Sequence, residues 1–222
     1  MTPRAVLLDA LGTLLELEPP APLLVRELAA GGVEVSEEEA WAALREEIAY
    51  YRAHHDIARD ERGLAVLRER CTAVLRDALP AHARDAPDLQ GALLAALRFR
   101  PYPEVHEALG ALRRGGARLV VVSNWDVSLH HALAETALSP LVDAAISSAE
   151  AGARKPDPAI FERALALAGV RAQDALHVGD SLDADVEGAR AAGIEPVLVV
   201  RDGSAPPPGV RAIASLSSLI ER

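Results

Sequence analysis

Apolar and polar positions follow two different periods along the chain. Between residues 23 and 97 the apolar residues recur every three or four positions, which is typical of amphipathic helices. Outside this block, helical stretches alternate with short apolar runs. These runs lie at residues 5–9, 118–123, 144–147, 175–180 and 196–200. Continuous apolar strands separated by helices predict a parallel sheet that is covered on both faces.

The helical block interrupts this alternation directly after the first strand. The sequence therefore predicts an α/β fold, in which a Rossmann-like parallel core receives an inserted helical domain. We expect the core to comprise residues 1–16 and 99–222, and the insertion to comprise residues 17–98 with three to four helices. Ser36 followed by Glu39 predicts a capping box at the start of one of these helices.

Composition and charge narrow the class of protein. Half of the residues are apolar, which is enough to bury a sizeable core. The formal net charge of −10 argues against a nucleic-acid binder, because such a protein needs a basic face to neutralise phosphates. No apolar run approaches the roughly 20 residues of a membrane span. With one cysteine, Cys71, and no signal-peptide pattern, we expect a cytoplasmic protein without membrane partners.

Polar residues follow the predicted strands at their carboxyl ends, where parallel sheets bind ligands. They are Asp9, Gly12, Thr13, Ser123, Asn124, Lys155, Asp180 and Asp185. A carboxylate can attack phosphorus and form an aspartyl phosphate, which divides one difficult step into two. Further carboxylates offer hard oxygen ligands to Mg²⁺, and hydroxyl, amide and backbone N–H groups can hold phosphoryl oxygens.

Lys155 is the only lysine among 23 basic side chains, all the others being arginine. A compact ammonium fits between carboxylates and a phosphoryl group where a planar guanidinium would not. The retention of lysine at this one position therefore favours a role for Lys155 in charge stabilisation beside the nucleophile.

The order Asp-x-x-Gly-Thr, Ser-Asn, Lys-Pro-Asp and Gly-Asp-x-x-x-x-Asp resembles the haloacid dehalogenase superfamily over essentially the whole chain. The resemblance implies that the insertion is a type I cap, which closes over the active site. It also implies that Asp9 is the nucleophile and Lys155 its catalytic partner. The implied Mg²⁺ ligands are Asp9, the backbone carbonyl of Leu11, Asp180 and Asp185, with Asp183 as an alternative to Asp185.

The same resemblance implies the remaining site residues and the partner. Ser123, Asn124, Gly12 and Thr13 are expected to bind the substrate, a phosphorylated small molecule, and the chain to act as a monomer or homodimer. The sequence does not identify the substrate, because cap residues select it.

One position departs from the family's pattern. Most phosphatases of the family carry a second acid two residues after the nucleophile, where it protonates the leaving oxygen and later deprotonates the attacking water. Here that position is Leu11. The leaving group then needs little protonation, or an acid comes from the cap, where His54, His55 and Asp56 are candidates.

Two other readings of Leu11 stay open. Haloacid dehalogenases release a halide without a proton, although they use no metal and have a different fourth motif. A branch of uncharacterised relatives also carries an apolar residue here, which leaves room for a binding or regulatory protein with weak turnover. A phosphonate-cleaving enzyme is rejected, because it needs a cap lysine and residues 17–98 contain none.

Overall fold

The computed structural model describes residues 3–220 of the chain. It divides into two compact units, one formed by Met1–Glu16 with Pro101–Arg222 and the other by Leu17–Arg100. These boundaries lie at, or within two residues of, those expected from the sequence. The first unit is called the core unit below, and the second the helical unit.

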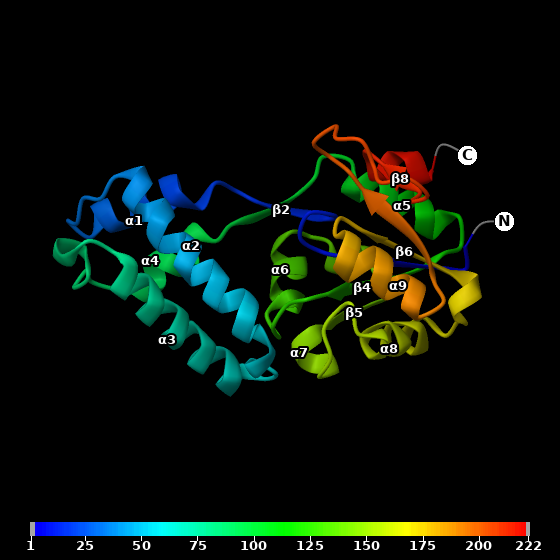
Figure 1. Ribbon diagram of the computed structural model, residues 1–222, viewed down its shortest axis with the longest axis horizontal. Coiled ribbons are helices and arrows are strands. Elements are labelled where there is room, and N and C mark those ends of the chain that lie inside the picture. Colours follow the sequence, from blue (N-terminus) through cyan, green and yellow to red (C-terminus); the bar gives the residue numbers. More distant parts are fainter. Residues whose placement is uncertain (1–2, 221–222) are drawn as a thin grey trace. The chain divides into compact units, whose positions relative to one another are not determined.

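The core unit contains, among the described residues, a six-stranded sheet in the order β5-β4-β1-β6-β7-β8 (Figure 1). Every neighbouring pair of its strands is parallel. The strands are β1 (Ala5–Leu8), β4 (Arg118–Ser123), β5 (Ala144–Ser147), β6 (Ala175–Gly179), β7 (Glu195–Val199) and β8 (Ala212–Ile213). The predicted α/β class with a parallel core sheet is therefore confirmed.

Helices connect these strands along the sequence. They are α5 (Val105–Arg114), α6 (Leu129–Glu135), α7 (Ser148–Ala151), α8 (Pro158–Ala168) and α9 (Gly188–Ala191), with a π-helical segment at Leu182–Glu187 before α9. Asp157 caps α8 by accepting a hydrogen bond from the N–H of Ala159, and Pro158 occupies its first position.

Strand β1 lies at the centre of the sheet and is buried on both faces. Ala5 and Leu7 pack with Ile160 and Phe161 of α8 in one apolar cluster. Val6 and Leu8 point to the opposite face, because side chains alternate along a strand, and they are equally inaccessible. This two-sided burial explains why the strand is a continuous apolar run, and it fixes the position at which Asp9 leaves the sheet.

The helical unit contains α1 (Pro20–Ala30), α2 (Glu37–His54), α3 (Glu61–Ala78) and α4 (Leu89–Ala96). The predicted capping box is present: the Ser36 hydroxyl accepts from the N–H of Glu39, and the Glu39 carboxylate accepts from the N–H of Ser36. Helices α2 and α3 pack against each other, and Leu44 on α2 and Leu67 and Leu75 on α3 are buried.

Three short strands were missed by the sequence reading. Strands β2 (Leu15–Leu17) and β3 (Phe99–Pro101) pair with each other at the two points where the chain passes from one unit to the other. Strand β8 has two residues and adds an edge strand to the main sheet. Segments of two or three residues are too short to show a period. Their strand character comes from the hydrogen-bonding partner rather than from local propensity.

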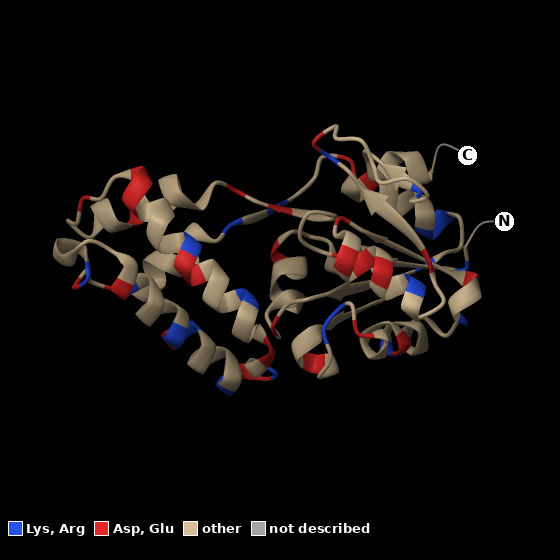
Figure 2. Ribbon diagram, viewed as in Figure 1, with Lys and Arg blue, Asp and Glu red and all other residues tan. Residues whose placement is uncertain are grey.

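Acidic and basic residues are scattered over the helices of both units (Figure 2). Within residues 3–220, no helix is both long and apolar enough to cross a membrane.

Candidate active site

Asp9 follows β1 directly and is buried, with 5% of its surface exposed. Its N–H donates to the carbonyl of Val178 on β6, which continues the parallel ladder by one residue. Its Oδ1 accepts two hydrogen bonds, from the Ser123 hydroxyl at 3.1 Å and from the Lys155 ammonium at 2.6 Å. Among the described residues nothing donates a hydrogen bond to Oδ2, so this oxygen is free to bind or react.

Lys155 joins two carboxylates. Its Nζ lies 2.6 Å from Oδ1 of Asp9 and 2.6 Å from Oδ1 of Asp185, and its side chain is 2% exposed. Burial by itself would lower the pKa of Lys155, but the two carboxylates outweigh it and hold this pKa above its usual value. The side chain therefore carries a fixed positive charge beside Asp9.

The side-chain amide of Asn124 holds the backbone of Lys155. Its Nδ2 donates to the Lys155 carbonyl at 3.0 Å, and its Oδ1 accepts from the Lys155 N–H at 2.8 Å. The predicted contact between this amide and a phosphoryl group therefore has a competing partner. In this conformation Asn124 positions Lys155, and its contact with a phosphoryl group stays a prediction.

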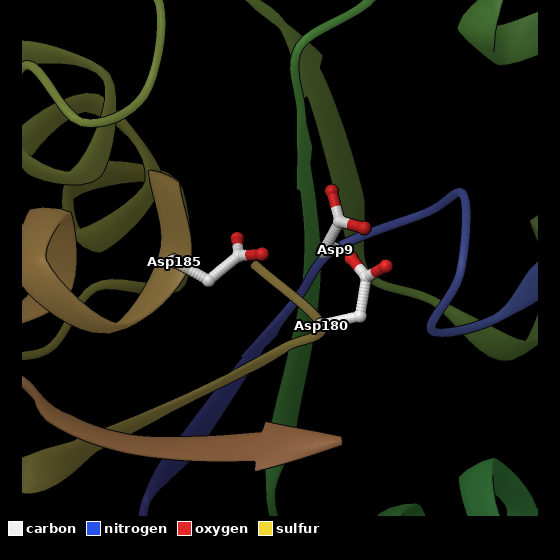
Figure 3. A group of neighbouring side chains, drawn as sticks. All are labelled: Asp9, Asp180 and Asp185. Atoms are coloured by element: carbon white, nitrogen blue, oxygen red, sulfur yellow. The ribbon is translucent and has the colours of Figure 1, made fainter. Parts of the chain in front are cut away.

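Three carboxylates converge at the end of the sheet (Figure 3). Asp9 and Asp180 lie beside each other, and Asp185 points toward them from the segment Leu182–Glu187. Each offers one oxygen, and these oxygens lie within 4.8 Å of one another. Asp183 is exposed and does not join this cluster, so the structure favours Asp185 over Asp183 as the second late acid.

Asp185 is held by three donors. Its Oδ1 accepts from Lys155 and from His177 Nε2 at 2.8 Å, and its Oδ2 accepts from the N–H of Ser181 at 3.0 Å. Burial opposes ionisation of this carboxyl, but Lys155 and His177 outweigh it, and the pKa of Asp185 lies well below its usual range. Gly179 is required here because a Cβ at this position would overlap the Asp185 carboxylate.

Asp9 shows the opposite shift although it shares Lys155. Burial raises the pKa of Asp9 to about 6 against the opposing pull of Lys155, and repulsion from Asp185 and Asp180 adds to the rise. The pKa of Asp180 is also raised, by burial and then by Asp185. With one ammonium among three carboxylates, the ionised cluster lacks positive charge, and a divalent cation would supply it.

The loop after Asp9 has a closed hydrogen-bond pattern. The N–H of Gly12 donates to Leu15, and the N–H of Thr13 donates to Ala10. Thr13 is fully buried, and its hydroxyl has no partner among the described residues. In this conformation the loop itself uses both N–H groups, and substrate binding by Gly12 and Thr13 stays a prediction.

The free backbone groups of the loop lie one or two positions earlier. Within residues 3–220, the N–H groups of Ala10 and Leu11 donate no hydrogen bond, and the carbonyl of Leu11 accepts none. The Leu11 carbonyl therefore has no partner in the described part of the chain that would compete with its predicted role as a ligand.

Arg201, which the sequence reading missed, holds this loop from the end of β7. Its guanidinium donates to the carbonyls of Gly12 at 3.2 Å and Thr13 at 2.7 Å, and it forms an ion pair with Glu104 at 2.8 Å. It also lies 3.5 Å above the centre of the Tyr102 ring. Arg201 follows the last predicted strand, at the same sheet edge as the other site residues, and only this position could have indicated its role from the sequence.

His177 is a hydrogen-bonded residue of the core. It is fully buried on β6, its ring meets Phe161 edge-on at 4.9 Å, and Nε2 bonds Asp185. Because the Asp185 carboxylate can only accept, the proton lies on Nε2.

The acid candidates of the insertion lie in the helical unit. His54 is exposed and stacks on Tyr50 at 4.1 Å, with Nδ1 bonded to the Tyr50 carbonyl. His55 is buried and pairs with Asp56 at 3.1 Å.

Comparison with known proteins gives one consistent family. A model of haloacid dehalogenase-like hydrolases matches residues 3–193. Haloacid dehalogenase-like hydrolase domain-containing protein 3 of Bos taurus is 43% identical over 91 residues, which is 41% of this chain and 36% of that protein. The chain thus matches little more than a third of the length of this relative. Glyceraldehyde 3-phosphate phosphatase of Methanopyrus kandleri is 32% identical over 190 residues, covering 80% of this chain and 73% of that protein.

Solved structures show the same fold. A HAD phosphatase from Thermococcus onnurineus superposes with a TM-score of 0.67 at 25% identity, covering 97% of this chain and 95% of that one. A dehalogenase with an intermediate complex gives 0.71 at 25% identity, covering 98% and 96%. A phosphatase and a dehalogenase thus share this fold, so the fold alone does not distinguish the two activities, and the residues of the site are needed for that.

Proposed function

The chain belongs to the haloacid dehalogenase-like hydrolases, and within this family we propose that it is a Mg²⁺-dependent phosphatase for a phosphorylated small molecule. One observation carries the proposal: the nucleophile Asp9 shares a cluster with two further carboxylates and a buried ammonium. A carboxylate that attacks a phosphoryl dianion needs this combination of cation ligands and fixed positive charge.

Mg²⁺ fits the groups that are present. Asp9, Asp180, Asp185 and the free carbonyl of Leu11 are oxygen donors, which Mg²⁺ prefers. Gly12 leaves room for Asp180, because a Cβ at this position would overlap the Asp180 carboxylate. When bound, the ion neutralises charge on the phosphoryl oxygens and on Asp9.

The chain's own residues supply the remaining steps. Lys155 and Ser123 hold Oδ1 of Asp9, which leaves Oδ2 without a hydrogen bond from any described residue. Asp9 attacks phosphorus through this Oδ2. The ammonium of Lys155 stabilises the charge that develops between nucleophile and phosphoryl group. The free N–H groups of Ala10 and Leu11 are suited to bind equatorial phosphoryl oxygens.

The similarity to a protein named glyceraldehyde 3-phosphate phosphatase, at 32% identity over 80% of this chain, supports phosphoryl chemistry without naming a substrate. We further propose that the helical unit is the type I cap of the family, that it selects the substrate, and that the chain works in the cytoplasm as a monomer or homodimer.

A haloacid dehalogenase is the second candidate. Leu11, where a phosphatase of this family usually has an acid, favours it, because halide leaves without a proton. Asp180 counts against it, because a third carboxylate beside Asp9 without a cation would only add repulsion.

Release of inorganic phosphate from a panel of phosphorylated metabolites, with Mg²⁺ or with a chelator, tests the proposal. We expect release with Mg²⁺, none with the chelator, and none from Asp9→Asn with Mg²⁺. Chloride release from 2-chloro acids serves as the control reaction. Chloride release without phosphate release would favour the dehalogenase. Binding of phosphoryl compounds without any turnover would favour a binding or regulatory protein.

A further inference from the structure

The side chain of Leu11 occupies the position from which the leaving group would normally receive its proton. Leu11 is 38% exposed and offers no proton. Its place is fixed, because the Arg201 guanidinium holds the next two carbonyls and the N–H of Gly12 bonds Leu15. These bonds hold the loop in the register that presents Leu11 at this position.

The side chains that bond Asp9 do not replace the missing acid. The Ser123 hydroxyl donates its proton to Asp9 Oδ1, and the Lys155 ammonium lies between Asp9 and Asp185. Asp185 is itself saturated by donors to both oxygens. Among the described residues of the core unit, every proton donor bonded to Asp9 is thus directed at the nucleophile rather than at a leaving oxygen.

We infer that the site is built for phosphoryl compounds whose leaving group departs as a stable anion, namely acyl phosphates and phosphoanhydrides, rather than for phosphate esters of alcohols. This inference rests on the proposed phosphatase function and names its substrate class. An acyl phosphate releases a carboxylate and a phosphoanhydride releases a phosphate anion. Neither requires a proton in the transition state, whereas an alkoxide does.

The steps balance without an acid from the enzyme. Oδ2 of Asp9 forms a bond to phosphorus while the bond from phosphorus to the leaving oxygen breaks, and that oxygen keeps the electron pair. In the second step water attacks the aspartyl phosphate, the Asp9 carboxylate leaves, and a proton of the water passes to a phosphoryl oxygen. The products are the carboxylate of Asp9 and dihydrogen phosphate.

The expected size of the effect follows from general acid catalysis, which contributes roughly 10²–10⁴-fold to the rate. Alcohol esters should be disfavoured by about this factor relative to a family member that has the acid.

The test measures kcat/KM for acetyl phosphate, aryl phosphates of graded leaving-group acidity, and glycerol phosphate, all with saturating Mg²⁺. In the wild-type chain log kcat/KM should fall steeply as the leaving group becomes more basic. Leu11→Asp should flatten this slope and raise the ratio of glycerol phosphate to acetyl phosphate turnover by at least roughly tenfold. Leu11→Asn, which matches the size of Asp without its acid chemistry, should leave the slope steep. Melting curves of both variants confirm that they fold.

The outcomes separate the inference from the function beneath it. The wild-type chain could hydrolyse every compound of the series with log kcat/KM falling only slightly as the leaving group becomes more basic. Another group would then supply the proton, which would overturn the inference and leave the phosphatase proposal standing. An equal rise of the ratio in Leu11→Asn would also overturn it. Release of phosphate from no member of the series would overturn the proposed function itself.

Discussion

The carboxylate of Asp9 has one ammonium and two carboxylates as neighbours, and this environment decides its chemistry. Asp9 and Asp180 could be predicted as site residues because each directly follows a strand that an apolar run makes visible. Lys155 and Asp185 lie further from a strand end, and they were predicted from the single lysine and from the family motif. The sequence did not predict which backbone N–H groups are free or that Asn124 holds Lys155. Those facts depend on hydrogen bonds inside loops, and no side-chain pattern reports them.

The raised pKa of Asp9 makes Mg²⁺ binding dependent on pH. The ordinary value is 3.8, and in the folded chain it rises to about 6, so without a cation Asp9 is protonated as the pH falls through that value. Protons and Mg²⁺ compete for the same oxygens. The apparent dissociation constant for Mg²⁺, measured by calorimetry, should be nearly constant above about pH 7 and should rise by up to about tenfold per pH unit below about pH 6.

Asp9→Asn provides the matched control, because the amide has the same shape and does not titrate in this range. Its weaker Mg²⁺ binding should vary less with pH than that of the wild-type chain. A wild-type affinity that stays constant from about pH 7 to pH 5 would contradict the assignment of Asp9 as a ligand.

At the scale of elements, the turn after β1 depends on Gly12 for two separable reasons. Its φ is +89°, and a Cβ there would overlap the Asp180 carboxylate. Gly12→Ala should therefore lose about 1–2 kcal/mol of stability and should also weaken Mg²⁺ binding, because Asp180 is displaced. Denaturant unfolding and Mg²⁺ titration measure the two effects.

Gly116 allows the two effects to be distinguished. Its φ is +86°, but no atom lies within 4 Å of the site of an added Cβ. Gly116→Ala should lose similar stability without a change in Mg²⁺ affinity. Equal Mg²⁺ affinities in both variants would show that the contact between Gly12 and Asp180 does not position the ligand.

Arg201 connects the end of β7 to the same turn, and its removal tests that connection. Arg201→Met keeps the apolar stem but leaves the carbonyls of Gly12 and Thr13 without their donor. We expect a loss of about 2 kcal/mol in unfolding free energy and a weaker Mg²⁺ affinity, because the Leu11 carbonyl is no longer held in place. Arg211→Met removes a more exposed pair with Glu195 and should change the unfolding free energy by less than about 1 kcal/mol. Similar effects from both substitutions would argue against a positioning role for Arg201.

The long elements were predictable, and the short ones were not. Strand β4 has the bounds that the sequence indicated, because its four consecutive apolar residues lie between a charged and a polar residue. Strand β8 has two residues, and its pairing with β7 is visible only in the folded chain.

For the whole molecule, the proposed Mg²⁺ site links metal binding to global stability. A ligand that binds only the folded chain at about 100 times its dissociation constant adds about 2.7 kcal/mol. For a chain of this size, 1 kcal/mol corresponds to about 2–4 °C in Tm. The melting transition of the core unit should therefore rise by roughly 5–10 °C with Mg²⁺. Asp180→Asn should abolish this rise, whereas Asp183→Asn, in the same loop but outside the cluster, should retain it. A shift that survives in Asp180→Asn would place the ion elsewhere.

The division into two units was the part of the whole-molecule organisation that the sequence made most visible. The pattern of apolar residues changes near residues 17 and 98, where the chain enters and leaves the helical unit. Between these positions the sequence shows helices without strands, whereas strands and helices alternate on either side. The substrate was not predictable, since the residues that select it do not share a strand-end position with the catalytic groups.

The most direct test of the account is whether phosphate becomes covalently attached to Asp9. The chain is mixed with Mg²⁺ and acetyl phosphate, quenched in acid, and mapped by peptide mass spectrometry. We predict one phosphoryl group on the peptide that contains Asp9, formed and lost at rates that match turnover and absent in Asp9→Asn. Phosphate release without this adduct, or undiminished release from Asp9→Asn, would contradict the assignment of Asp9 as the nucleophile.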